Sequence, residues 1–477
     1  MRGGAFKVSE TSIRQGWPVQ PTALWRWILI GGYVLIVGLN LPGHLSTDSI
    51  IGLFEGRTGV RTSWGPPMFS AILGVFDKVI PGTGFYLACT ILLLIASWAS
   101  LPSLRPRMSW IAPVVLLAAF ALPQVVVYQG IVWKDVLFAN LAVAGFVALG
   151  RAAVRWQTRE AAWCVAFAWL CLAFACLVRQ NGAVAVLFAA LALGWIGART
   201  WKKGALWALA GFVAPLLIAF LLDAVTPVRE PPGTKSQDRG VRLVQNYDLV
   251  AAVAQNPKIS LPILQADDPQ ALGVVRQLAG RVYSPTRIDT LSRSEELASA
   301  IWRFEDDKVS RQWLELIQRD PLGYAGRRLS IFDWVFRTPQ IDQCLPVHIG
   351  VAGPPDLEAK LHLVEGIEPQ DAELYNYVTW WLDTPFYSHL AYALLAGAVA
   401  IFLLIRRTGA DIAIAGLMFA GLSFAASFFV ISIACDYRYL YMLDLTAITG
   451  LLYVAVDPRG RTPIESAPRF PRLRRRR

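Results

Sequence analysis

The chain has 477 residues, of which 55% are hydrophobic and only 17% are charged, with 18 Trp and 23 Phe. A soluble protein of this length could not bury so much apolar surface, so the composition excludes an ordinary soluble enzyme and predicts a polytopic membrane protein. The net charge of +11 does not indicate a partner nucleic acid, because the cations fall in alternate loops between apolar segments.

Ten apolar segments are long enough to cross a bilayer. The hydrocarbon core is about 30 Å thick, so a helix crosses it in roughly 20 residues. The segments are residues 24–41, 84–102, 110–127, 133–150, 161–178, 181–199, 204–226, 386–405, 411–433 and 437–456. No small-residue cleavage site follows the first segment, which we therefore interpret as a retained span. The predicted fold class is an all-α polytopic membrane protein with about ten transmembrane helices.

Cations in alternate loops predict the topology. They are Arg2, Lys7, Arg14, Arg26, Arg105, Arg107, Arg151, Arg155, Arg159, Arg199, Lys202, Lys203, Arg406, Arg407 and the tail RFPRLRRRR. With all of them in the cytoplasm, the positive-inside rule is satisfied and both termini are cytoplasmic. We assign residues 1–23 to a cytoplasmic N-terminal segment. Residues 457–477 are predicted to form a basic cytoplasmic tail that contacts anionic lipid headgroups.

The first outer loop, residues 42–83, begins near HLSTDSI and carries Asp48 directly after the first span. This carboxylate either caps a helix in a Ser/Thr-rich context or belongs to a site at the membrane surface. Further along, PMFSAILGVFDKVI (residues 67–80) is apolar but short. If it spanned the membrane, every later basic loop would lie outside, so we predict an interfacial or re-entrant helix on the outer face.

Two later outer loops carry polar clusters. These are Gln129, Lys134 and Asp135 in YQGIVWKDVLF, at the entry to the fourth span, and Arg179, Gln180 and Asn181 in VRQNG, after the fifth. Ionisable residues at the ends of spans need partners or a polar cavity, because hydrocarbon does not solvate them. These residues could form a functional site. Alternatively, Lys134 and Asp135 snorkel to the headgroups, and Arg179 anchors the end of a helix.

A large insertion, residues 227–385, follows the seventh span. It opens with a turn-rich linker, TPVREPPGTKSQDRG, and then places apolar residues at three- and four-residue spacing, which predicts a mainly helical extracytoplasmic domain. Near its end, Trp380 and Trp381 either bind a glycan or pack. Cys344 and Cys435 fall on the outer side, and the sequence leaves open whether they form a disulfide. No metal-ligand spacing is present.

The C-terminal transmembrane helices, residues 386–456, contain a last polar cluster in CDYRYLYM. Its members are Asp436, Tyr437, Arg438 and Tyr439, at the entry to the tenth span. This cluster could belong to a site at the outer face. Alternatively, its tyrosines form an aromatic belt at the membrane interface, and Arg438 snorkels to the headgroups.

Three cations and three carboxylates thus face one aqueous compartment, and together they fit one chemistry. Transfer of a group from a lipid-linked phosphate needs a carboxylate to accept the proton of the acceptor hydroxyl. It also needs cations or a metal to hold the departing phosphate. Asp48 is placed for the first role. The residues placed for the second role are Lys134, Arg179 and Arg438.

This layout resembles the GT-C class of membrane glycosyltransferases, such as the aminoarabinose transferases of lipid A and the protein O-mannosyltransferases. In that class an acidic residue follows the first span, a His-Pro-Pro-Leu element opens an interfacial helix, and a second acidic residue lies beside the third and fourth spans. Asp48 matches the first acid, WGPPM (residues 64–68) resembles the proline pair, and Asp135 matches the second acid. Gly65 stands where the class often has histidine. The outer domain also lies between the seventh and eighth spans, whereas many members carry theirs at the C-terminus.

The resemblance covers residues 24–226 and implies an inverting glycosyltransferase of the bacterial cytoplasmic membrane. The implied donor is a polyprenyl-phosphate sugar, and the acceptor is a hydroxyl of a glycan, lipid or protein at the outer face. Asp48 is then the catalytic base, and Asp135 assists through the acceptor or a metal, so a divalent ion held by these two carboxylates is left open. The side chains predicted to bind substrate are Trp64, Gln129, Gln180, Asn181, Tyr437 and Tyr439.

Other functions also suit a polytopic protein with polar residues at its outer face. A transporter or flippase of lipid-linked sugars would have broken helices near the midplane, whereas the ionisable residues here gather at one face. A polysaccharide polymerase or ligase would perform a related transfer on a different fold. An O-acyltransferase is disfavoured because only His389 of the four histidines falls in a span.

Overall fold

The computed structural model describes residues 20–63, 65–231 and 237–460. Throughout these ranges the regular elements are helices, and extended backbone pairs only in isolated bridges. The predicted all-α class is therefore confirmed. Trp64, the N-terminal segment as far as residue 19 and the basic tail from residue 461 lie outside the described residues.

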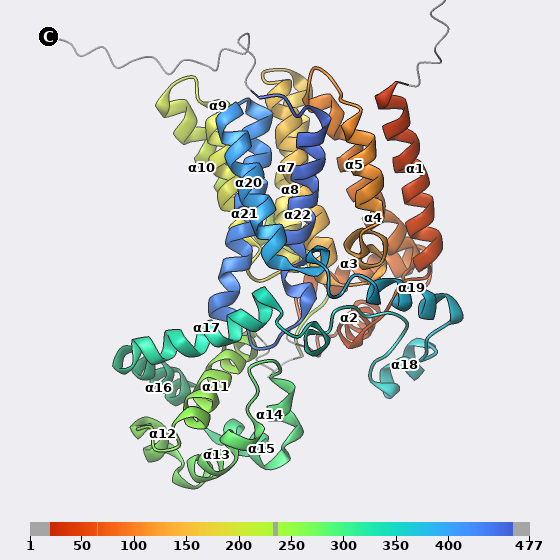
Figure 1. Cartoon of the computed structure of the whole chain (residues 1–477). Coiled ribbons are helices and arrows are strands. Elements are labelled where there is room, and N and C mark those ends of the chain that lie inside the picture. The colour runs from red at the N-terminus through yellow and green to blue at the C-terminus, as the bar shows by residue number, and fades with distance from the viewer. Residues whose placement is uncertain (1–19, 64, 232–236, 461–477) are drawn as a thin grey trace, which may run out of the picture.

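Eight helices of the described chain are long and apolar enough to cross a membrane. They are α1 (Pro21–Asn40), α4 (Gly84–Ser100, continued by the 3-10 helix η1, Leu101–Leu104), α7 (Lys134–Val154), α8 (Arg159–Val178), α10 (Trp201–Val225), α20 (His389–Arg406), α21 (Gly409–Ile431) and α22 (Tyr441–Val456, preceded by the 3-10 helix η5, Tyr437–Leu440). These helices form an upright bundle in which α1 begins and α22 ends at the same end (Figure 1).

Two of the ten predicted spans take a different form. The third is a pair bent by 70°, in which α5 (Ile111–Phe120) is followed by α6 (Pro123–Val126) and η2 (Tyr128–Gly130). Pro123 explains the bend, because proline disfavours helical backbone at the residue before it, and Leu122 is extended. The sixth is α9 (Ala183–Gly197), whose 15 residues span only about 22 Å.

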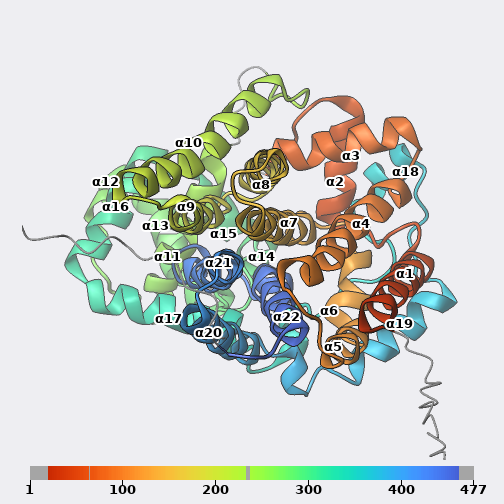
Figure 2. The ribbon, with the colours of Figure 1, turned by 90° about the horizontal axis from the view of Figure 1, so that it is seen from above.

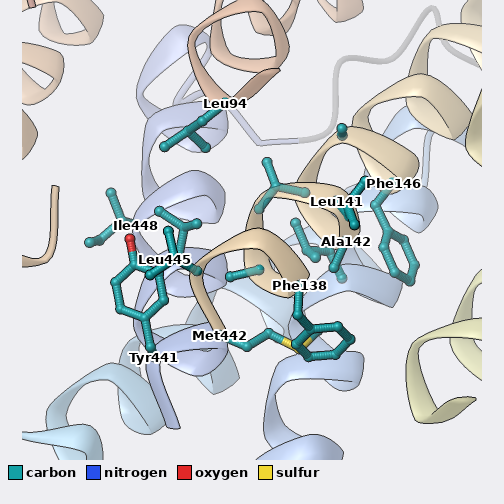
Figure 3. Packing of buried hydrophobic residues seen from close by; sticks show 14 of the residues in the cluster. Leu94, Phe138, Leu141, Ala142, Phe146, Tyr441, Met442, Leu445 and Ile448 are labelled. Atoms are coloured by element: carbon teal, nitrogen blue, oxygen red, sulfur yellow. The ribbon is translucent and has the colours of Figure 1, made fainter. Parts of the chain in front are cut away.

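The centre of the bundle is the contact between α7 and α22, seen end-on in Figure 2. Phe138 and Leu141 of α7 pack near Met442 and Leu445 of α22 (Figure 3). In a membrane, such contacts stabilise helix pairs through dispersion and hydrogen bonds, because lipid is as apolar as the side chains. A buried amide adds such a bond: Asn140 Nδ2 donates to the Thr90 carbonyl over 3.0 Å.

One end of the bundle is covered by short helices and by the insertion. Helices α2 (Thr47–Thr58) and α3 (Pro67–Val79) pack on each other there, and α3 coincides with the helix predicted for residues 67–80. The helices of the insertion are α11 (Gln237–Gln255), α12 (Pro262–Asp267), α13 (Pro269–Val282), α14 (Asp289–Arg293), α15 (Glu295–Arg303), α16 (Asp306–Arg319), α17 (Pro321–Arg337), η3 (Ile341–Cys344), α18 (Pro355–Leu361), α19 (Pro369–Thr379) and η4 (Pro385–Tyr387). Figure 1 shows them beyond the ends of the membrane helices.

The insertion has its own apolar core, formed mainly by α11 to α16. Its polar centre is a buried ion pair, in which Arg328 Nη2 lies 2.6 Å from Asp248 Oδ2. Trp313 Nε1 donates to the same carboxylate oxygen over 2.8 Å. Helix α17, which carries Arg328, also contacts α20 and α21, so this domain is joined firmly to the bundle.

The basic loops lie together at the opposite end of the bundle, where α1 begins. Two ion pairs join helix ends there: Arg406 Nη2 lies 2.6 Å from Asp411 Oδ1, and Arg105 Nη2 lies 3.2 Å from Asp457 Oδ2. One end of the bundle therefore carries the basic loops, and the other is covered by α2, α3 and the insertion. The predicted site residue Asp48 lies at the covered end.

Candidate active site

The candidate site is built on three chain segments whose backbones pair. Residues 44–45 lie between residues 130–132 on one side and 350–352 on the other. The His44 N–H donates to the Gly130 carbonyl over 3.0 Å. Only glycine fits at that point, since a Cβ on Gly130 would lie 2.0 Å from Asn40 Oδ1. This pairing brings the first turn of α2 beside the first turn of α7.

Asp48 is the second residue of α2, and its carboxylate is not the cap of that helix. Ser46 precedes the helix, and its N–H donates to Ser49 Oγ over 3.3 Å. Ser49 Oγ in turn donates to the Val132 carbonyl over 2.7 Å. The positive end of the helix dipole favours a carboxylate in this first turn. The oxygens of Asp48 therefore remain available for other partners.

Two cations hold one oxygen of Asp48. Lys134 Nζ, at the start of α7, lies 3.3 Å from Asp48 Oδ2, and Arg438 Nη1, on η5, lies 2.8 Å from it. The Asp48 side chain is 39% exposed, whereas those of Lys134 and Arg438 are 13% and 12% exposed. The charge of Lys134 lowers the pKa of Asp48 well below its ordinary value; burial opposes this shift, and the charge of Arg438 adds to it. The partly exposed carboxylate of Asp48 thus lies against two largely buried cations, Lys134 and Arg438.

The position of Arg438 is set by an aromatic ring and a second carboxylate. Its guanidinium lies over the Trp133 ring, 4.7 Å from the centroid, a contact that orients a cation without neutralising it. The Trp133 indole N–H donates to Ser46 Oγ over 2.8 Å. Asp436 Oδ2 lies 3.1 Å from Arg438 Nη2. The orientation of Arg438 is therefore fixed independently of Asp48.

The loop that carries Arg438 is fastened to the outer domain. A disulfide joins Cys435 to Cys344, so the pairing that the sequence left open is present. The Cys435 N–H donates to the Thr286 carbonyl over 2.7 Å, and Arg328 Nη1 donates to the Ser432 carbonyl over 2.7 Å. The insertion thus positions Arg438.

Asp135 and Arg179 form a buried ion pair close enough to Lys134 and Arg438 for Arg179 to interact electrostatically with both cations. Arg179 Nη1 donates to Asp135 Oδ1, and both side chains are buried, with exposures of 3% and 9%. The guanidinium also lies near the rings of Phe424, Phe428 and Tyr439, 5.4 to 5.7 Å from their centroids. Burial lowers the pKa of Arg179 to about 10. The sequence placed Asp135 and Arg179 in the site, and the roles predicted for them stay predictions.

Two of the side chains predicted to bind substrate lie inside the bundle. Gln129 is fully buried, and its Nε2 donates to Asn140 Oδ1 over 2.9 Å and to the Tyr441 hydroxyl over 2.8 Å. The buried Tyr437 hydroxyl accepts from Gln124 Nε2 over 2.9 Å. Both side chains are used in contacts between helices, and the substrate contacts predicted for them stay predictions.

The other predicted substrate contacts lie nearer to the surface. Asn181 is half-buried, and its Nδ2 donates to Ser427 Oγ over 2.8 Å, while Gln180 is exposed. Tyr439 stacks on Phe428 with 5.5 Å between ring centroids and lies next to both Arg438 and Arg179. Their predicted contacts with substrate are not tested by these positions.

A small cavity of about 70 Å³ opens beside Asp48 and Lys134 and is also lined by Glu55. Sequence analysis missed Glu55, which lies seven residues after Asp48 and so two turns along the same helix face. It is fully buried. Its Oε1 accepts from the N–H groups of Thr62 and Ser63, each over 2.7 Å. Glu55 therefore ties residues 62 and 63, next to Gly65 and Pro66 in the cavity wall, to α2.

The two carboxylates for which the sequence left a metal open each pair with a cation in this structure. Two cations hold Asp48 Oδ2, and Arg179 holds Asp135 Oδ1, so positive charge lies against one oxygen of each carboxylate. Within the described ranges, no three His, Cys, Asp or Glu side chains come close enough to hold an ion.

Comparison with known proteins gives structural matches only. No family model and no curated protein sequence matches the chain. One similar solved structure is the Archaeoglobus fulgidus oligosaccharyltransferase in complex with Zn and sulfate, at 12% identity over 90% of this chain and 49% of that one, with a TM-score of 0.41. Another is the oligosaccharyltransferase AglB of the same organism with an inhibitory peptide and a dolichol-phosphate, at 13% identity, 92% and 51% coverage and a TM-score of 0.43.

ArnT from Cupriavidus metallidurans in the apo state also matches, at 13% identity over 90% of this chain and 77% of that one, with a TM-score of 0.32. The chain spans about half the length of the archaeal structures it matches.

Proposed function

We propose that this protein is a membrane glycosyltransferase that moves a sugar from a polyprenyl-phosphate donor to a hydroxyl acceptor. The observation that carries the proposal is the Asp48 carboxylate, 39% exposed and held between Lys134 and Arg438. These three groups lie where apolar helices end, so a lipid tail can rest against the bundle while its phosphate meets the cations. The acceptor is a glycan, lipid or protein.

The donor phosphate is expected to take the place that Asp48 holds in the free protein. Asp48 serves there as the counter-ion of Lys134 and Arg438. When phosphate oxygens bind these cations instead, the pKa of Asp48 rises toward its ordinary value and the carboxylate becomes a better base. Donor binding would thus prepare the base for the next step.

In the transfer step, Asp48 accepts the proton of the acceptor hydroxyl while the acceptor oxygen attacks the anomeric carbon. The bond from this carbon to the phosphate oxygen breaks, and its electron pair stays on polyprenyl phosphate. Lys134 and Arg438 stabilise the developing phosphate charge. A single displacement inverts the anomeric centre. No step in this sequence passes through a metal.

Substrate entry requires movement of the loop formed by residues 59–66. The cavity of about 70 Å³ beside Asp48 is much smaller than the roughly 300–1,000 Å³ of typical ligand pockets. Ser63, Gly65 and Pro66 of this loop line it. The hydrogen bonds to Glu55 hold the loop in place, so we propose that they break or shift when the donor enters.

We place the reaction at the outer face of the bacterial cytoplasmic membrane, with both termini in the cytoplasm. Two features support this orientation. The Cys344–Cys435 disulfide is typical of an oxidising compartment, and it lies at the Asp48 end. The basic loops lie at the other end, as the positive-inside rule expects.

The proposed function is tested by following both products. Purified protein should transfer labelled sugar from a polyprenyl-phosphate donor to an envelope acceptor fraction and release one polyprenyl phosphate per sugar. Movement of intact donor across vesicles without any transfer would instead identify a transporter. Donors with different sugars, each tried with the same acceptor fraction, would give the sugar specificity.

The pH dependence should report the coupling between Asp48 and Lys134. Because Lys134 contributes most to lowering the pKa of Asp48, Lys134→Gln should raise that pKa. The carboxylate needed for catalysis would then be protonated at a higher pH, so the acid limb of kcat/KM should move upward, toward or above the ordinary Asp value of about 4. Lys78→Gln, which removes an exposed lysine on α3, is the control. An unmoved limb in Lys134→Gln would contradict the coupling.

A further inference from the structure

A second, larger cavity lies at the opposite end of the bundle from Asp48. It measures about 370 Å³ and is lined by the loop between α7 and α8, the first turns of α8, and the connection from α9 to α10. Figure 2 shows α8, α9 and α10 side by side at the edge of the bundle, and each of the three contacts the other two. Its volume is within the range of ligand sites.

The wall of this cavity is preformed by three tryptophans: Trp156, Trp169 and Trp207. Trp156 and Trp207 meet edge to face, with 5.1 Å between centroids. A Cβ on Gly197 would lie 2.1 Å from Trp207 Cδ1, so glycine is needed for this ring to lie where it does. The apolar ring faces of these tryptophans therefore form a wall against which an apolar chain can pack.

The mouth of the cavity is positively charged. Arg199 and Lys203 line it, both are exposed, and neither forms an ion pair within the described part of the chain. Glu160 is already neutralised, at 2.7 Å from Arg151 and 3.7 Å from Arg155. Helices α8 and α10 both begin at the cavity, and their dipoles add positive potential. An anion is therefore the expected occupant of the mouth.

The surroundings indicate that this anion carries apolar chains. Exposed apolar side chains continue from the cavity along the outer faces of α8 and α10, including Trp163 at 76%, Leu206 at 64% and Leu209 at 60%. These are surfaces that lipid would cover. The chain's own tail, RFPRLRRRR, is basic and would be repelled by Arg199 and Lys203. A membrane lipid with an anionic headgroup matches both the charge and the apolar wall.

We propose that this cavity binds one anionic phospholipid of the adjacent leaflet. The phosphate lies between Arg199 and Lys203, and an acyl chain packs against the tryptophans. Basic pockets between transmembrane helices are known to bind such headgroups. The site is separate from Asp48 and does not depend on the function proposed for it.

The test titrates delipidated full-length protein with phosphatidylglycerol or with phosphatidylcholine of the same chains and counts bound lipids by native mass spectrometry. Wild type should bind one phosphatidylglycerol in preference to phosphatidylcholine. Arg199→Gln with Lys203→Gln should weaken that binding by roughly 10- to 30-fold. The matched control, Arg159→Gln with Lys202→Gln, removes two cations from the same end outside the cavity and should change binding by less than about 2-fold.

A further variant separates the cavity from general surface attraction. Ala162→Phe adds a ring at the cavity wall and keeps both cations, so it should lose phosphatidylglycerol binding while thermal unfolding in detergent stays near wild type. Unchanged binding in this folded variant would overturn the proposal. Equal loss in the control double variant would do the same, because it would show surface attraction alone. Competition by inorganic phosphate as strong as that by lipid would also overturn it.

Discussion

Replacing Asp48 with asparagine is expected to slow sugar transfer by roughly 10²- to 10⁴-fold, the usual contribution of a general base. The amide has the shape of the carboxylate but cannot accept the proton of the acceptor hydroxyl. The side chain is 39% exposed, so the folded protein should tolerate the change. The measurement is kcat for labelled-sugar transfer at equal folded amounts.

The same variant also separates a base from a phosphate-positioning residue. Without its internal counter-ion, the pair of Lys134 and Arg438 should hold polyprenyl phosphate at least as tightly as in wild type. Product inhibition should therefore persist or strengthen in Asp48→Asn while kcat falls. Asp383→Asn, an exposed carboxylate of the outer domain, should leave both quantities unchanged. Full activity in Asp48→Asn would exclude it as the base.

Replacing Asp135 with asparagine is expected to destabilise the protein by about 3–5 kcal/mol, the usual cost of removing one partner of a buried ion pair. Arg179 would keep its charge among Phe424, Phe428 and Tyr439 with no carboxylate beside it. A second change, Arg179→Met, removes that charge and suits the apolar rings. The double variant should recover most of the lost stability, measured as the free energy of unfolding in detergent micelles.

Activity decides between a structural and a catalytic role for Asp135. If the double variant is as stable as wild type and transfers sugar at a comparable rate, Asp135 acts only by positioning α7 against α21 and η5. If it is stable but inactive, or if Asp135→Asn stays folded and loses transfer, Asp135 takes part in the reaction, as the resemblance to GT-C enzymes implies.

The sequence could predict the spans because length, hydropathy and loop charge are local properties. It could not predict the bend at Pro123 or the shortness of α9, since both depend on where a helix ends within an otherwise continuous apolar run. The 3.6-residue pattern of α2 is also weak, because that helix is buried on more than one side by α3 and by the cavity loop.

The residues of the candidate site could be selected from the sequence more readily than the ion pairs that they form with one another. Asp48, Lys134 and Arg438 are conspicuous because charges at the ends of spans are costly without partners. Which carboxylate meets which cation depends on the backbone pairing of residues 44–45 with residues 130–132 and 350–352, which no local pattern encodes. The same signal also selected Gln129, although a polar residue at the end of a span serves equally well to join helices.

The distance along the chain between Asp48 and Arg438 has a consequence for biogenesis. These residues are separated by 390 positions, so Arg438 leaves the ribosome long after Asp48. Asp48 and Lys134 are therefore made before Arg438, and all the intervening spans and the insertion are made before the three residues can meet. A nascent or truncated chain that lacks η5 and α22 contains Lys134 but not Arg438. It therefore has only one of the two cations that are proposed to hold the donor phosphate. Under the function proposed above, we expect such a chain to bind no lipid-linked sugar, so that sugar transfer would begin only after the last span has been inserted.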